Sequence, residues 1–226
     1  MFSLEPGYLQ ARILDCGGGP SSFAAEVAEQ RGRVVAIDPL YADPVQELRE
    51  RIDASFDQVV ELARRNAHRF VWGDRIGSPQ ALAKLRRAAM DRFLDDFERE
   101  GEGGRYLQGA LPRLPFADDA FDLALCSHLL FLYSEQFDLR FHVESLVELA
   151  RVAREVRVFP LLDMEGEPSR HLRGAREGAG SAGLTAEEVV VPYEFQRGGN
   201  QMLVVARRDG GINQGDTASQ PGATTL

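Results

Sequence analysis

Short apolar runs alternate with amphipathic segments along most of this chain. The apolar runs predict strands buried on both faces, and the segments between them repeat apolar residues every three or four positions, which predicts helices. The predicted strands are 12–15, 33–37, 105–107, 123–126, 155–159, 187–196 and 201–207. The predicted helices are 23–30, 45–63, 82–97, 135–153 and 170–183. This order indicates an α/β fold in which helices cover both faces of a mostly parallel sheet.

Two features near the end of the chain add detail to this pattern. The turn Gly198-Gly199-Asn200 separates the last two predicted strands and indicates an antiparallel hairpin, so the last strand is expected to be reversed. Three glycines, Gly174, Gly178 and Gly180, fall in the last predicted helix. Because glycine weakens a helix interior, we expect this helix to be short and broken.

A long insertion separates the strand at 33–37 from the strand at 105–107. A crossover needs far fewer residues, and the insertion, about 41–103, holds two regular helical patterns. Three roles are open for them: a lid over a substrate, ordinary crossover helices, or the surface of a homodimer. Between them lies Trp72, the single tryptophan, which is expected either in the core or against a substrate.

Composition narrows the classes of function. The 226 residues suit one domain, predicted at 1–207, and the Gly-, Ser- and Thr-rich tail at 208–226 is expected to be disordered. The net charge of −9 disfavours nucleic acid and anionic membranes as partners. We see no secretory signal and no run long enough to cross a bilayer, so a cytoplasmic protein is expected. Two cysteines, Cys16 and Cys126, give no disulfide framework and no zinc site; each lies at the carboxyl end of a predicted strand and is expected to be a small buried residue.

A glycine-rich corner near the start of the chain is the expected site of chemistry. The first strand ends on Asp15, and the glycines of 17–19 lead into the helix at 23–30. Glycines let the backbone approach a ligand closely, and a helix N-terminus offers unpaired N–H groups to an anion. The next strand ends at Asp38, about 20 residues later, where a carboxylate can accept both hydroxyls of an adenosine ribose. The carboxylate of Asp15 would repel a pyrophosphate but would tolerate a cationic cofactor.

The segment Asp15-Cys16-Gly17-Gly18-Gly19-Pro20-Ser21 resembles the first motif of class I S-adenosylmethionine-dependent methyltransferases. Asp15 and the first and third glycines match the motif, whereas Ser21 stands where a third motif glycine is usual. A second match lies at 109–122, where Leu-Pro-Phe follows the third strand and Phe-Asp opens the fourth. The resemblance covers about 11–207 apart from the insertion, and it implies a Rossmann-like seven-stranded sheet with a reversed last strand.

The resemblance also implies roles for residues at the ends of the strands. S-adenosyl-L-methionine is the implied cofactor, with its ammonium near Asp15 and its ribose on Asp38. The family's acidic residue for the adenine amino group aligns with Ala110, so the adenine is expected to rely on backbone N–H groups and apolar contacts. The expected cofactor-binding residues are Asp15, Gly17, Gly18, Gly19, Asp38, Leu40, Ala110, Leu111, Cys126 and Ser127.

The implied reaction is methyl transfer to a small-molecule acceptor by in-line displacement, in which the protein mainly aligns the reactants and excludes water. If the acceptor must lose a proton, His128 is the expected base, because it follows the fourth strand and its ring titrates near neutral pH. A structural role for His128 is also open, and Tyr133 and His142 are secondary candidates. The acidic chain and aromatic-rich insertion are compatible with a neutral or cationic acceptor.

Rival classes of function fit the sequence less well. A short-chain NAD-dependent reductase needs a tyrosine four residues before a lysine, and the single lysine, Lys84, has none there. The Asn/Asp-Pro-Pro-Tyr/Phe motif of enzymes that methylate nucleobase amines is absent. The alternative that stays open is a non-catalytic S-adenosylmethionine-binding protein, which the departure at Ala110 favours.

Overall fold

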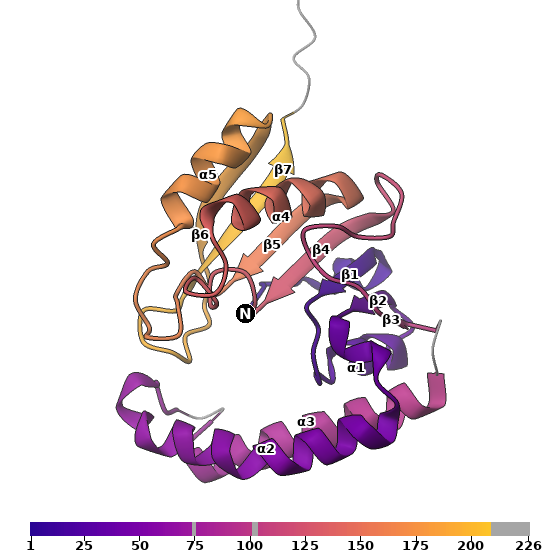
Figure 1. The fold of residues 1–226 in the computed structure, drawn as a ribbon, viewed down its shortest axis with the longest axis vertical. Coiled ribbons are helices and arrows are strands. Elements are labelled where there is room, and N and C mark those ends of the chain that lie inside the picture. Colours follow the sequence, from indigo (N-terminus) through magenta and orange to yellow (C-terminus); the bar gives the residue numbers. More distant parts are fainter. Residues whose placement is uncertain (74–75, 101–103, 209–226) are drawn as a thin grey trace, which may run out of the picture.

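A computed structural model of the chain describes residues 1–73, 76–100 and 104–208. These residues form a seven-stranded sheet in the order β3-β2-β1-β4-β5-β7-β6 (Figure 1). The strands are β1 (Arg12–Cys16), β2 (Arg33–Ile37), β3 (Tyr106–Leu107), β4 (Phe121–Ser127), β5 (Ala153–Phe159), β6 (Leu184–Val190) and β7 (Gln201–Arg207). The α-helices are α1 (Phe23–Glu29), α2 (Val45–Arg65), α3 (Pro79–Glu100), α4 (Leu139–Val152) and α5 (Leu172–Ser181). Short 3-10 helices are η1 (Pro6–Gln10), η2 (Pro39–Ala42) and η3 (Ala67–Arg69).

Parallel pairing aligns the carboxyl ends of β1, β2 and β4. Where β1 pairs with β4, Asp15 lies opposite Leu125 and Cys16 lies opposite Cys126. The last strand, β7, runs antiparallel to both β5 and β6. The expected mostly parallel sheet with a reversed last strand is therefore confirmed. The residues that follow β1, β2 and β4 meet at one edge, where open α/β sheets bind their ligands.

Alternate residues of the central strands enter two cores, one on each face of the sheet. Ile13 packs with apolar residues of α1, α2 and α3, whereas Leu14 packs with apolar residues of α4 and α5. Cys16 and Cys126 are both buried in the core of α4 and α5 as free thiols. Burial raises the pKa of both thiols, that of Cys126 to about 12. They are neutral at physiological pH and pack as small apolar side chains.

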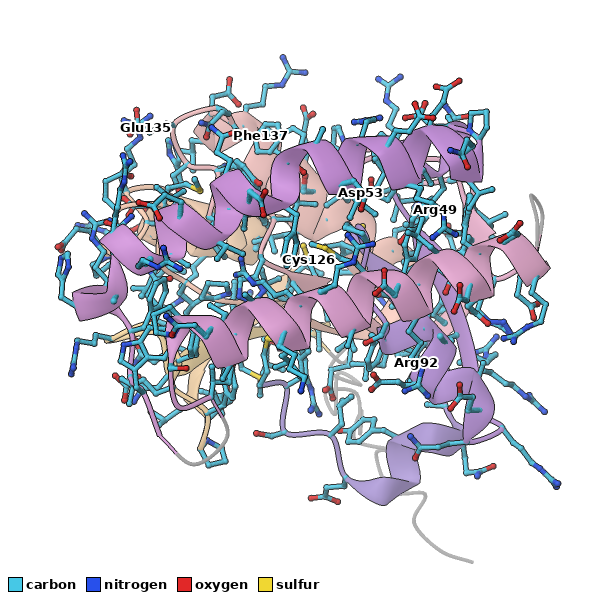
Figure 2. All side chains as sticks on the ribbon, turned by 90° about the horizontal axis from the view of Figure 1, so that it is seen from below. Arg49, Asp53, Arg92, Cys126, Glu135 and Phe137 are labelled. Carbon is cyan, nitrogen blue, oxygen red and sulfur yellow. The ribbon has the colours of Figure 1, made fainter. Side chains whose placement is uncertain are left out.

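The helical insertion after β2 is confirmed, and α2 and α3 lie side by side within it (Figure 2). Two ion pairs join them, one between Arg49 and Glu98 at 3.9 Å and one between Asp53 and Arg87. The first half of α2 and the second half of α3 bury their apolar residues against the sheet. The second half of α2 and the first half of α3 lie beside the loops that follow β4 and β5. The insertion therefore reaches the edge at which the strands end.

The structure corrects the prediction that the last helix is broken by glycines, because α5 is continuous from Leu172 to Ser181. Two of its glycines face α4. A Cβ atom at Gly174 would lie 2.9 Å from the Leu139 methyl carbons, and one at Gly178 would lie 2.5 Å from Cγ2 of Val143. These glycines therefore let α5 pack closely on α4, and that packing offsets their weak helix propensity.

Substituting Gly178 by alanine should lower the stability of the fold. The added methyl group overlaps Val143, whose branched side chain has few alternative rotamers, so α5 must shift; such overpacking costs about 1–3 kcal/mol. Alanine at Gly180 is the matched control, because its Cβ atom would meet only Arg208 Nη2 at 3.5 Å. Thermal melting should show a lower Tm for Gly178→Ala and an equal or higher Tm for Gly180→Ala. Equal melting of the two variants would contradict this packing.

Several predicted boundaries differ by two or three residues, and two differ by more. The helix expected at 135–153 begins at Leu139, where Asp138 caps it by accepting a hydrogen bond from the Phe141 N–H. The strand expected at 187–196 is β6, which ends at Val190, so that 191–200 is a connection longer than a tight hairpin turn. Most of the predicted tail, 209–226, lies outside the described residues. Within the described ranges, no helix is both long and apolar enough to cross a membrane.

Candidate functional site

A cleft of about 1210 Å³ opens along the edge at which β1, β2 and β4 end. Its size exceeds that of a typical small-ligand pocket, so it can hold two small molecules side by side. Asp15, the glycine turn and Asp38 form one part of its wall, and Ser127, His128 and Leu129 form another. The remaining wall is contributed mainly by Met1–Leu4, by Val71, Gly73 and Ile76 of the insertion, and by Pro192–Phe195.

The backbone of the glycine turn, residues 17–19, has a conformation that residues with a side chain would not readily adopt. Gly17 and Gly19 have φ angles of 71° and 55°, in the left-handed region that glycine adopts at little cost. Gly18 lies so close to Tyr41 that a Cβ atom would come within 2.7 Å of the phenol oxygen. Tyr41 in turn donates a hydrogen bond to the Gly19 carbonyl at 2.8 Å. The turn is thus held in one conformation that leaves its outer side open to the cleft.

Asp38 ties this turn to the end of β2. One carboxylate oxygen accepts a hydrogen bond from the Gly19 N–H at 3.0 Å, and the other accepts one from the Leu40 N–H at 2.8 Å. Each carboxylate oxygen has a second lone pair, so Asp38 can still accept hydrogen bonds from a ligand hydroxyl. Burial raises the pKa of Asp38, while the two backbone hydrogen bonds lower it.

Asp15 is the most unusual charged group of the cleft, because it is 5 % exposed and lies near a second carboxylate. Burial, followed by repulsion from Asp38, raises the pKa of Asp15 to about 7. Among the described residues, no lysine, arginine or histidine forms an ion pair with either carboxylate. A buried carboxylate of this kind is costly unless a cation neutralises it, so the pair is suited to a positively charged ligand.

His128 lines the same cleft as these carboxylates and follows immediately after β4. Its φ angle of 52° is uncommon for a residue other than glycine. Ser127 donates its hydroxyl proton to the Met1 sulfur at 3.6 Å, so its oxygen is placed to accept a proton from His128 Nδ1 at 2.8 Å. Because Nδ1 is engaged by the Ser127 hydroxyl, Nε2 is the ring nitrogen that can face a ligand. Burial and the positive charge of Arg86 lower the pKa of His128 to about 4, so the expectation that its ring titrates near neutral pH is wrong and the ring stays neutral there.

The amino terminus covers part of the cleft because a buried arginine holds it. Arg157 of β5 donates hydrogen bonds to the Phe2 carbonyl at 2.6 Å and the Ser3 carbonyl at 3.3 Å, and it also contacts Tyr8. Figure 1 shows the amino terminus beside the ends of β4 and β5. The first residues are therefore a fixed part of the cleft wall.

The insertion covers the cleft from the other side and is tied to the connection between β6 and β7. The Val71 N–H donates to the Phe195 carbonyl at 2.7 Å, and Phe70 stacks on Phe195 with ring centroids 4.8 Å apart. Trp72 packs edge-on against both phenylalanines and donates its indole N–H to the Ala67 carbonyl at 2.8 Å. Trp72 is half-buried in this cluster rather than in the wall of the cleft.

The order β3-β2-β1-β4-β5-β7-β6 with β7 antiparallel is decisive for the fold. The chain has the class I methyltransferase fold. In this fold the ligand edge is the edge that holds Asp15, the glycine turn, Asp38 and His128, so the expected resemblance is confirmed at the level of architecture.

Known proteins resemble this chain in sequence or in structure. No family model matches the sequence. The chain is 29% identical over 208 residues to the uncharacterized protein MJ0045 of Methanocaldococcus jannaschii, with 92% of this chain and 90% of that protein covered. Among solved structures, the PH0226 protein of Pyrococcus horikoshii matches with 14% identity and a TM-score of 0.46, covering 88% of this chain and 82% of that one. The O-methyltransferase NcsB1 from neocarzinostatin biosynthesis matches with 15% identity and a TM-score of 0.46 over 89% of this chain, which spans about half (51%) of NcsB1.

Within the class I methyltransferase fold, the expected site residues fall into two groups. Asp15, Gly17, Gly18, Gly19, Asp38, Ser127 and His128 line the cleft together. Leu40, Ala110, Leu111 and Cys126 lie near the strand ends but do not line it. Of the secondary candidates for a base, Tyr133 lines the cleft, whereas His142 is fully buried in α4. The role of each of these residues in binding or catalysis stays a prediction.

Several residues of the cleft did not emerge from the sequence. Residues 192–195 were assigned to a strand by their apolar pattern, although Pro192 argues against a strand interior and is the signal that could have corrected it. The contact of the buried Arg157 with the first residues of the chain joins segments far apart in sequence and could not be predicted. Nothing in the local sequence indicated that Met1–Leu4 would reach the site.

Proposed function

We propose that this protein binds S-adenosyl-L-methionine and transfers its methyl group to a small-molecule acceptor. The observation that carries the proposal is the buried carboxylate of Asp15, which opens into the cleft beside the glycine turn with no cationic partner among the described residues. S-adenosyl-L-methionine has an ammonium and a sulfonium group, so it can supply the missing positive charge. A dinucleotide would instead bring a negatively charged pyrophosphate toward two carboxylates.

The residues of the cleft suit each part of this cofactor. Asp15 would attract the ammonium, directly or through water, and the glycine turn would allow close approach of the methionine part. Asp38 would accept hydrogen bonds from the ribose hydroxyls. Leu40 and the backbone N–H groups near Ala110 and Leu111 lie beside the cleft rather than in its wall; Leu40 would flank the adenine, and those N–H groups would donate hydrogen bonds to it.

The bound sulfonium supplies an activated methyl group, so this chain has three tasks. It orients the acceptor, excludes water and removes a proton where the acceptor carries one. The amino terminus, the insertion and the β6–β7 connection surround the cleft and support the second task. Nε2 of His128 is suited to the third task, removal of the acceptor's proton, because the ring is neutral at physiological pH and Nδ1 is already engaged by Ser127.

Calorimetric titration of the purified protein with S-adenosyl-L-methionine and with S-adenosyl-L-homocysteine tests the proposal. Binding of both nucleosides is expected, together with a rise in Tm, because a ligand that binds the native state stabilises it. NAD is the control ligand, since it shares the adenosine but carries a pyrophosphate. Binding of NAD without binding of either sulfur nucleoside would overturn the proposal.

Replacing Asp38 by alanine should weaken the binding of S-adenosyl-L-methionine. Loss of a charged acceptor of hydrogen bonds costs about 1.5–3 kcal/mol, which is roughly a 10- to 150-fold rise in Kd. The variant also frees the Gly19 and Leu40 N–H groups, so a somewhat lower Tm is expected as well. Asp57→Ala, an exposed site on α2, removes the same charge away from the cleft and should bind normally. An unchanged Kd for Asp38→Ala would refute the assigned role.

A further inference from the structure

A second, smaller pocket lies next to the main cleft and shares its wall. Its volume is about 220 Å³. It lies between two helix segments, the second half of α2 and the first half of α3, and the loops that follow β4 and β5. His128, Tyr193 and Phe195 line both this pocket and the main cleft. A molecule held in the smaller pocket can therefore present an atom at His128 to a cofactor in the main cleft.

The charge of this pocket differs from that of the whole chain. Arg69 and Arg86 line it, and no aspartate or glutamate is among its lining residues. Most arginines of the described chain are paired with a carboxylate, but no such ion pair is found for Arg69 or Arg86 within the described ranges. Arg86 keeps an exposed surface, and partial burial of its guanidinium lowers its pKa, while the nearby phenol of Tyr193 opposes that change. An acidic protein thus keeps two arginines, without carboxylate partners in the described chain, at the wall of one pocket.

Aromatic rings form much of the remaining wall. Phe70 and Phe195 are stacked, and Phe159 meets Tyr193 edge-on with ring centroids 5.8 Å apart. Apolar residues of α2, including Val59 and Ala63, complete the wall of this pocket. Such a wall favours a flat, apolar ring, and an arginine beside it favours a planar oxyanion that the guanidinium can bind through two parallel hydrogen bonds.

We propose that this pocket binds an aromatic acceptor that carries a carboxylate and a hydroxyl group, with the carboxylate paired to Arg86 and the hydroxyl directed to His128. This assignment rests on the proposed methyltransferase function and gives it a substrate class. It departs from the neutral or cationic acceptor that the overall charge of the chain favours, because the pocket's own charge is positive.

The reaction at this pocket balances with the groups present. An oxygen lone pair of the acceptor hydroxyl forms the new O–CH₃ bond as the C–S bond breaks, and the electron pair of that bond stays on sulfur. The hydroxyl proton passes to Nε2 of His128 and then to water. The products are a methyl ether and neutral S-adenosyl-L-homocysteine.

Three probes of one shape test the proposal on the full-length protein saturated with S-adenosyl-L-homocysteine. They are meta-hydroxybenzoate, meta-hydroxybenzamide and meta-hydroxybenzylamine, which are anionic, neutral and cationic at pH 7. Calorimetry should show the acid binding roughly tenfold or more tightly than the amide, and the amine binding more weakly than both. Equal affinities, a preference for the amine, or no binding of the acid at millimolar concentration overturns the proposal.

Variants then assign the preference to Arg86. Arg86→Gln should reduce the affinity for the acid to that for the amide, and Arg86→Lys should retain part of the preference. Lys84→Gln is the matched control, because it removes one positive charge from α3 at a residue that does not line the pocket. Retention of the full preference in Arg86→Gln overturns the assignment. If Arg86→Gln does not melt cooperatively, Arg86→Lys decides the question through its intermediate affinity.

The same titrations separate this proposal from the proposed function. If S-adenosyl-L-homocysteine binds and the acid does not, the substrate class is wrong while the cofactor assignment stands. If S-adenosyl-L-homocysteine does not bind, the cofactor assignment fails. The acid is then titrated into the free protein, where binding that depends on Arg86 supports an anion pocket and its absence refutes one.

Discussion

Replacing Asp15 by asparagine should make the unliganded protein more stable and its binding of S-adenosyl-L-methionine weaker. Asp15 is almost fully buried beside Asp38, and its pKa is raised from 3.8 to about 7. At neutral and alkaline pH the native state therefore holds a carboxylate that would be better solvated in the unfolded chain. Asparagine has nearly the same shape without the charge, so it removes this cost together with the attraction for a cation.

The sign of the pH dependence follows from the raised pKa. Below pH 3.8 Asp15 is neutral in both states and costs nothing; as pH rises toward 7 the unfolded state ionises first and the native state loses stability. The full cost, present above pH 7, has an upper limit of about 4 kcal/mol. The stability difference between Asp15→Asn and the native sequence should thus be largest above pH 7 and should shrink toward pH 4. Denaturant titrations at several pH values measure it.

Ligand binding should depend on pH in a related way. A cation beside Asp15 lowers its pKa, so the affinity of the native sequence should increase as pH rises toward 7 and then level off, with proton release on binding below that point. In Asp15→Asn the affinity should be lower and nearly independent of pH over this range. Calorimetry in buffers of different ionisation enthalpy detects the released proton. A variant that is less stable at pH 8, or that binds as tightly as the native sequence, would contradict the assigned role.

Much of the fold could be predicted because its strands are locally distinct. β2 was predicted to the residue, since Arg33–Ile37 is an apolar run that ends at Asp-Pro. The helices of the insertion were predicted because a turn residue and a proline mark the start of each, and each keeps a helical period. The α5 helix was misjudged for a physical reason: its glycines are matched to residues of α4 that lie far away in sequence.

Part of the candidate site could likewise be predicted from the sequence, and part could not. The glycine turn and Asp38 could be identified from the sequence because they follow consecutive strands that pair in parallel. The segments that surround the cleft could not be identified from the sequence. They depend on contacts between residues distant in sequence, such as Arg157 with the Phe2 carbonyl and Phe70 with Phe195. The pocket of Arg86 could not either, since its arginines are distinguished by the absence of carboxylates around them, which appears only in three dimensions.

His128→Asn should reduce turnover strongly while leaving cofactor binding nearly unchanged. Asparagine tolerates the positive φ angle of this position, and its amide N–H can replace the contact of Nδ1 with the Ser127 hydroxyl. It has no counterpart of Nε2, the atom assigned to accept the acceptor's proton. Loss of a general base lowers kcat by about 10²- to 10⁴-fold. His68→Asn, an exposed site in η3, is the control and should keep full activity.

The pH profile distinguishes this chemical role from a structural one. Because burial and Arg86 lower the pKa of His128, the ring is neutral above about pH 4, and kcat of the native sequence should not fall between pH 8 and pH 6 on its account. A rate limited by uncatalysed loss of the hydroxyl proton should instead rise with pH, so the residual activity of His128→Asn should increase toward alkaline pH. If the variant keeps the turnover and the flat profile of the native sequence, His128 serves only to shape the end of β4.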